Sequence, residues 1–76
     1  MHKDQAIEMQ SRGMLKDVVV LPNPSLCSEW IILFKDYAGR SHFLLRDTGE
    51  VTSCVNLESI VGLLKEIGFR RAEIAF

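Results

Sequence analysis

The sequence predicts a small α+β domain in which an antiparallel sheet of four to five strands packs one face against one main helix. Short runs rich in β-branched and aromatic residues alternate with turn residues between positions 17 and 55. Residues 57–67 then place apolar side chains at steps of three and four. The length of 76 residues, with 47% apolar and 25% charged residues, is typical of a single globular domain. The expected element order is β-β-β-β-α-β, preceded by an optional N-terminal helix.

The first thirteen residues are more polar than the rest. Their apolar side chains are few, and the sequence SRG at positions 11–13 would stop a helix. We therefore divide the chain into a flexible or weakly helical arm, residues 1–13, and a single α+β domain, residues 14–76.

The four expected strands before the helix are separated by residues that favour turns. Residues 17–21 (DVVVL) form the first, which ends at the PNP sequence of positions 22–24 because proline cannot continue a strand ladder. Residues 29–35 form the second and end at DYAG. Residues 41–46 form the third, which turns through DTGE into a short fourth strand at 51–55.

The main helix has recognisable ends. Asn56 can cap its first turn, and Glu58 places a negative charge where the helix dipole favours one. Gly68 occupies the position of a left-handed C-terminal cap. Beyond it, residues 72–76 (AEIAF) alternate as expected for a last strand.

The run WIILF at positions 30–34 predicts a strand that is apolar on both faces, and such a strand needs cover on both sides. Towards the helix we expect Val18, Val20, Trp30, Ile32, Phe34, Phe43, Leu45, Ile74 and Phe76. The opposite face carries Val19, Leu21, Ile31, Leu33 and Leu44. Monomers seldom expose such a patch, so the arm, a second copy of the chain or another protein should cover it. Tyr37, at a hairpin tip, is a further contact candidate.

The net charge of −1 and isoelectric point near 6.1 create no overall field that would attract nucleic acid or acidic lipid. A local patch for nucleic acid would have to combine the basic residues Arg40, Arg46, Lys65, Arg70 and Arg71. Arg70 and Arg71 also suit the end of a helix, where positive charge meets exposed carbonyl groups. We favour that solvated role and keep nucleic-acid binding as the alternative.

No motif for catalysis, for a cofactor or for a metal is apparent. His42 has no recognisable nucleophile with a matched acid around it, and Cys27 has no basic cluster that would activate its thiol. Asp36, Asp47 and Glu50 occupy positions that turns favour, and their spacing matches no EF-hand loop. We therefore expect a protein that is not an enzyme. A small hydrolase or redox enzyme using His42 or Cys27 is the third and least favoured alternative.

The two cysteines, Cys27 and Cys54, do not have the spacing of a zinc site, and we expect both to be free thiols. The longest apolar run is far shorter than the ~20 residues that a bilayer requires. The sequence MHKDQ at the start has no apolar signal core. These features predict a cytoplasmic protein without a membrane span.

The segments GEVTS (49–53), NLESI (56–60) and LKEIGF (64–69) resemble the C-terminal part of small accessory proteins carried by bacterial plasmids and integrated mobile elements. The resemblance covers about a third of the chain and implies a bacterial, cytoplasmic, non-enzymatic accessory role. It transfers no functional residues. Together with the apolar second face, it predicts a non-catalytic protein-interaction module, homodimeric through a sheet face or a sheet edge.

Overall fold

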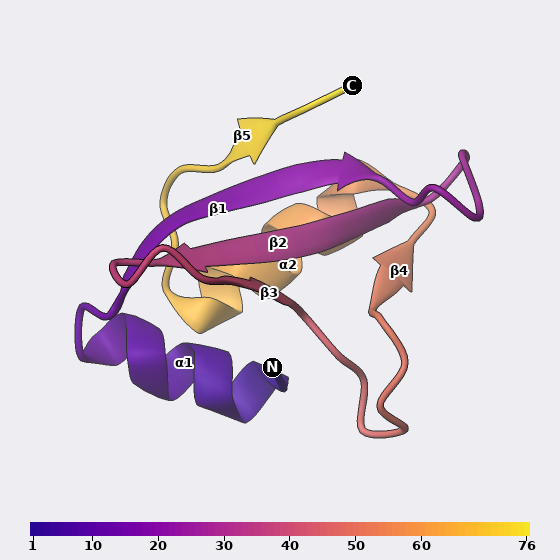
Figure 1. The fold of residues 1–76 in the computed structure, drawn as a ribbon. Coiled ribbons are helices and arrows are strands. Elements are labelled where there is room, and N and C mark those ends of the chain that lie inside the picture. The colour runs from indigo at the N-terminus through magenta and orange to yellow at the C-terminus, as the bar shows by residue number, and fades with distance from the viewer.

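The computed structural model describes residues 1–76, and its centre is a long antiparallel pair of strands, β1 (Leu15–Pro22) and β2 (Trp30–Asp36), as Figure 1 shows. The three consecutive valines of β1 favour this extended conformation because branched side chains fit the pleated surface of a sheet. β3 (Ser41–Phe43) and β4 (Ser53–Cys54) both pair with β2, and β5 (Glu73–Ile74) pairs with β1.

The α+β class is confirmed, but the expectation of an entirely antiparallel sheet is wrong. β5 runs parallel to β1, with Val19 opposite Glu73 and Val20 opposite Ile74. The chain leaves β4 beside β2, passes through α2 (Leu57–Ile67) and reaches the outer edge of β1. A helical connection of this kind permits parallel pairing, whereas a tight turn permits only antiparallel pairing.

The ends of α2 are held by the local interactions that its sequence suggests. The side-chain Oδ1 of Asn56 accepts a hydrogen bond from the Ser59 amide at 2.9 Å. Gly68 adopts φ +112°, and its amide and that of Phe69 both donate to the Leu64 carbonyl. A left-handed glycine after the last turn satisfies carbonyl groups that would otherwise lack partners.

A second helix, α1 (Lys3–Ser11), packs on the same face of the sheet as α2, so the helical alternative for residues 1–13 is the one in the structure. Ala6 of α1 is fully buried, and Lys3 forms an ion pair with Glu66 of α2. One core joins both helices to the sheet, and it consists of Ala6, Leu15, Val18, Val20, Ile32, Phe34, Leu44, Ile60, Leu64 and Ile67.

The prediction that Leu44 faces away from the helix is wrong. Leu33 lies opposite Phe43 in the β2–β3 ladder, and the Leu44 amide donates to the Ile32 carbonyl. Leu44 is therefore on the core side and is only 2% exposed, while Phe43 is on the other face. A change of register by one residue exchanges the two faces of a strand, and in this hairpin the turn at residues 36–40 aligns β3 with β2.

The two long edges of the sheet differ. Beside β3, the amino group of Met1 donates to the Phe43 carbonyl at 3.0 Å, and the Leu45 amide donates to the Met1 carbonyl at 2.8 Å. The start of the chain thus continues the sheet on that side. On the opposite side the sheet ends at β5. Neither helix is long and apolar enough to cross a bilayer.

Candidate functional site

The face of the sheet that no helix covers carries five apolar side chains, which we call the open face: Val19, Leu21, Ile31, Leu33 and Phe43. They are neighbours across three strands, since Val19 lies opposite Leu33, Leu21 opposite Ile31, and Leu33 opposite Phe43. None of them belongs to the core that the helices cover. Four of the five expected residues are therefore together, and Phe43 takes the place of Leu44.

Polar and charged residues surround the open face. Asp17 and Lys35 pair across β1 and β2 at one end, and Ser53 lies opposite Ile31 at the other. Glu73 lies beside Val19 at the β5 edge. An apolar centre with a polar rim is the usual composition of a protein interface.

Exposure is uneven over the open face. Val19 and Ile31 are only 9% and 4% exposed, whereas Phe43 is 41% exposed. Leu21 and Leu33 are half-buried. A partner on this face would therefore cover mainly Leu21, Leu33 and Phe43.

Tyr37 lies outside the open face. It is 70% exposed in the β2–β3 turn, where it lines a shallow hollow with Met9 and Met14. This hollow adjoins the C-terminal end of α1, not the centre of the sheet.

The five basic residues proposed for nucleic acid do not form one strip. Arg40 pairs with the Asp36 carboxylate at 3.3 Å. Arg46 lies in the loop between β3 and β4 and donates to the Ser53 carbonyl at 3.0 Å. Lys65, Arg70 and Arg71, in contrast, line a single groove between α2 and β5.

This α2–β5 groove has a volume of about 390 Å³. Its apolar lining comes from Val61, Leu64, Phe69, Ala72 and Ile74, and its polar lining consists of the three cations, with no carboxylate among them. Val61 and Ile74 are 46% and 43% exposed, which leaves apolar surface on both walls open to solvent.

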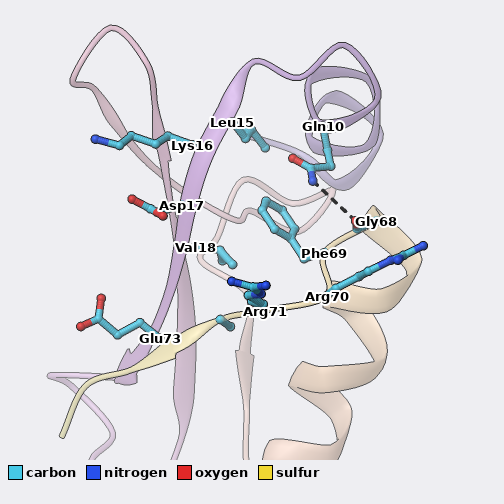
Figure 2. Close-up of a pocket in the computed structure, with 11 residues that line it drawn as sticks. Gln10, Leu15, Lys16, Asp17, Val18, Gly68, Phe69, Arg70, Arg71 and Glu73 are labelled. Carbon is cyan, nitrogen blue, oxygen red and sulfur yellow. Dashed lines mark hydrogen bonds between the residues drawn. The ribbon is translucent and has the colours of Figure 1, made fainter.

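A neighbouring cleft of about 500 Å³ shares Phe69, Arg70 and Arg71 with the groove and extends to α1 (Figure 2). The Phe69 side chain points into this cleft between Leu15 and the end of α2. Gln10 donates through Nε2 to the Gly68 carbonyl at 3.5 Å, while its buried Oε1 has no partner. Asp17 and Glu73 also border the cleft, but their carboxylates point to the other side of β1.

Comparisons with known proteins identify no relative. No family model matches the chain, and neither a curated protein nor a solved structure was found to be similar to it. The functional interpretation therefore depends on the surfaces of this chain.

The titratable cluster at the β2–β3 turn stabilises the turn itself. Asp36 is 6% exposed, and its Oδ1 accepts hydrogen bonds from the amides of Ala38 and Arg40, each at 2.9 Å. Its Oδ2 lies 3.0 Å from Nε2 of His42. The hydrogen bond with His42, followed by the one from the Arg40 amide, lowers the pKa of Asp36 from 3.8 to about 2.

The other candidate chemical groups are dispersed. Cys27 is an exposed free thiol in the loop before β2, at the opposite end of that strand from Asp36 and His42. Cys54 is a half-buried free thiol in β4. No group of three or more His, Cys, Asp or Glu side chains is arranged to hold a metal ion.

Sequence reasoning missed the apolar walls of the α2–β5 groove. The sequence pattern predicts Ile74 in the core and Val61 in the buried stripe of the helix, yet both are partly exposed in the groove. Val61 lies four residues after Leu57 and three before Leu64, so it continues the apolar helical pattern, and the sequence gives no signal of its exposure.

Proposed function

We propose that this protein is a non-catalytic interaction module that forms a homodimer through its open face. The observation that supports the proposal is that both helices lie on one side of the sheet, while Leu21, Leu33 and Phe43 remain partly exposed on the other. Stacked sheets bury such side chains between them at a separation of about 10 Å.

A second copy fits this face because a two-fold axis places the same patch on both partners. Such an interface is self-complementary when an apolar centre meets an identical apolar centre. Asp17, Lys35 and Glu73 would then lie at the rim, where charges remain in contact with water.

The expected dimer is weak. Val19 and Ile31 are already largely shielded, so association gains area chiefly from Leu21, Leu33 and Phe43. Stable interfaces commonly bury about 800 Å² on each partner, which is more than three partly exposed side chains supply by themselves. We expect a dissociation constant on the order of micromolar, and we assign the dimer to the cytoplasm, where both cysteines would remain free thiols.

The proposal predicts that Leu33→Asp yields a folded monomer. A carboxylate between Val19 and Phe43 would have to be buried in the dimer without a partner, which costs several kcal/mol, while in the monomer it faces water. Sedimentation velocity of the wild type from about 5 to 500 µM should show a rising dimer fraction, and the variant should stay monomeric.

Two further variants make this test decisive. Phe43→Asp changes a more exposed residue on β3 and should give the same result if Leu33→Asp fails to fold. Val61→Asp places the same charge on α2, on the opposite side of the sheet, and should dimerise like the wild type. A wild type that is monomeric at every concentration contradicts the proposal.

Nucleic-acid binding remains the alternative, and the separation of the five basic residues argues against it. A protein that neutralises several phosphates loses affinity steeply as salt is raised. Binding of a DNA or RNA duplex that is strong at 50 mM salt and lost at 200 mM would favour the alternative.

A further inference from the structure

We infer that the α2–β5 groove binds an extended, acidic peptide segment of a partner protein, which adds a strand to the free edge of β5. This surface is separate from the open face and lies on the helix side of the sheet. The inference depends on three features: the free edge, the apolar walls and the charge of the groove.

The first feature is the unpaired edge of β5. The Ala75 amide donates to the Val20 carbonyl at 2.8 Å, so the N–H of Ala75 faces β1. Because successive residues of a strand direct their backbone groups to opposite sides, the N–H and C=O of Ile74 face away from β1. β5 is the last strand of the sheet, and an unpaired edge is a template for an added strand.

The second feature is the position of α2 beside that edge. Val61 and Leu64 of α2 and Ile74 of β5 line the same groove, and Val61 and Ile74 are nearly half exposed. A strand added to β5 would direct alternate side chains into this groove. Its apolar side chains would therefore be those at every second position.

The third feature is charge. Lys65, Arg70 and Arg71 line the groove without any carboxylate, although the whole chain has a net charge of −1. A cationic groove on a slightly acidic protein selects for negative charge on the ligand. It also disfavours a second copy as the occupant, since two such grooves would repel each other.

The apolar walls favour a peptide over nucleic acid. Phosphate contacts alone would make no use of Val61, Leu64 and Ile74. Single-stranded nucleic acid usually stacks its bases on exposed aromatic rings. The only aromatic ring in the groove, that of Phe69, is stacked on Phe34 at a centroid distance of 5.8 Å.

The test begins with selection of a random seven-residue peptide library, displayed on phage, against the immobilised full-length protein. Enriched peptides should carry net negative charge and place apolar residues at alternate positions. The most enriched peptide is then labelled and titrated against the wild type by fluorescence polarisation. No enrichment, or enrichment of neutral or basic peptides, overturns the inference.

Matched double variants locate the site. Replacing two groove cations, Arg70→Gln with Arg71→Gln, should weaken binding about tenfold. Arg12→Gln with Lys35→Gln removes the same charge outside the groove and should change affinity less than about twofold. Equal losses in both double variants would show attraction by net charge alone and overturn the inference.

Two additional measurements test the binding mode. Two N-methylated versions of the peptide are compared, one methylated at its odd-numbered amides and one at its even-numbered amides. One version should fail to bind, because methylation removes its hydrogen bonds to β5. Unchanged affinity of both versions overturns strand addition. A 12-nucleotide single-stranded DNA serves as the competing ligand. If it binds more tightly than the peptide, and if this binding requires Arg70 and Arg71, the groove is a nucleic-acid site and the peptide inference is overturned.

The monomeric Leu33→Asp variant should bind the peptide like the wild type, so this test and the dimer test can fail separately.

Discussion

Asp36 shows how one buried carboxylate organises the turn that sets the sheet register. Its two oxygens bind the amides of Ala38 and Arg40 and the side chain of His42. These bonds fix the turn, and the turn aligns β3 with β2 so that Leu44 enters the core. The sequence indicates a turn acid at position 36, but the partnership with His42 exists only once β2 and β3 are paired.

The lowered pKa of Asp36 predicts an acid-sensitive contribution to stability. In the unfolded chain the group has its ordinary pKa of 3.8, and in the folded protein about 2. The folded state therefore prefers the ionised form. The contribution is complete above pH 3.8 and is lost as the pH falls through about 2.

Urea unfolding of the wild type and Asp36→Asn at pH 5 and pH 2.5 measures this effect. The variant should be less stable at pH 5, and the difference between the two proteins should shrink at pH 2.5, because Asp36 is then protonated in the unfolded wild type and must lose that proton on folding. Asp47→Asn controls for loss of one acidic side chain from an exposed turn. A difference that stays constant between the two pH values would contradict the assignment.

Among the helices and strands, α2 is the element whose first and last residues are set most fully by its own neighbouring sequence. Its cap at Asn56, its buried positions Ile60, Leu64 and Ile67, and its end at Gly68 lie within thirteen consecutive residues. Short-range hydrogen bonds and the helical period are sufficient to specify them. β3 is the opposite case, because its inward side depends on its partner strand.

The glycine within α2 and the glycine that caps its end should respond oppositely to alanine. Gly68→Ala should destabilise the protein by about 1–3 kcal/mol, since φ +112° is strained for any residue with a side chain. Gly62→Ala should stabilise it by about 0.5–1 kcal/mol, because Gly62 is within the helix and an added Cβ meets nothing within 4 Å. Chemical denaturation measures both, and the same sign for both would refute this account of α2.

At the scale of the whole molecule, placement of both helices on one face makes the protein asymmetric. α1 completes the core through Ala6 and contacts α2 through the Lys3–Glu66 ion pair and the Gln10–Gly68 hydrogen bond. It therefore does not cover the open face. The open face and the α2–β5 groove are the two surfaces that follow from this arrangement.

Removal of residues 1–13 should consequently destabilise the domain. Met1, Ala6, Ile7 and Met9 pack against the core, and loss of their burial should cost about 3–5 kcal/mol. That is a large share of the ~5–15 kcal/mol available to a typical domain. Urea denaturation followed by circular dichroism should show a much lower midpoint, or no folded baseline, for a chain beginning at Met14.

A matched control separates core packing from surface charge. Lys3→Ala removes only the ion pair with Glu66, whose side chains are largely exposed, and should cost less than about 1 kcal/mol. An unchanged midpoint for the shortened chain would mean that residues 1–13 are dispensable for folding.

The sequence by itself determined the α+β class, the turns, the limits of α2 and the two-sided apolarity of β2, because these depend on residues close together in the chain. Only the tertiary structure decided that α1 lies beside α2, that β5 runs parallel to β1, and that Phe43, not Leu44, joins the open face. These features depend on strand register and on packing between segments that are distant in the sequence. The alternation of apolar and polar residues along one strand does not specify either of them. The grouping of Lys65, Arg70 and Arg71 in one groove, apart from Arg40 and Arg46, has the same origin.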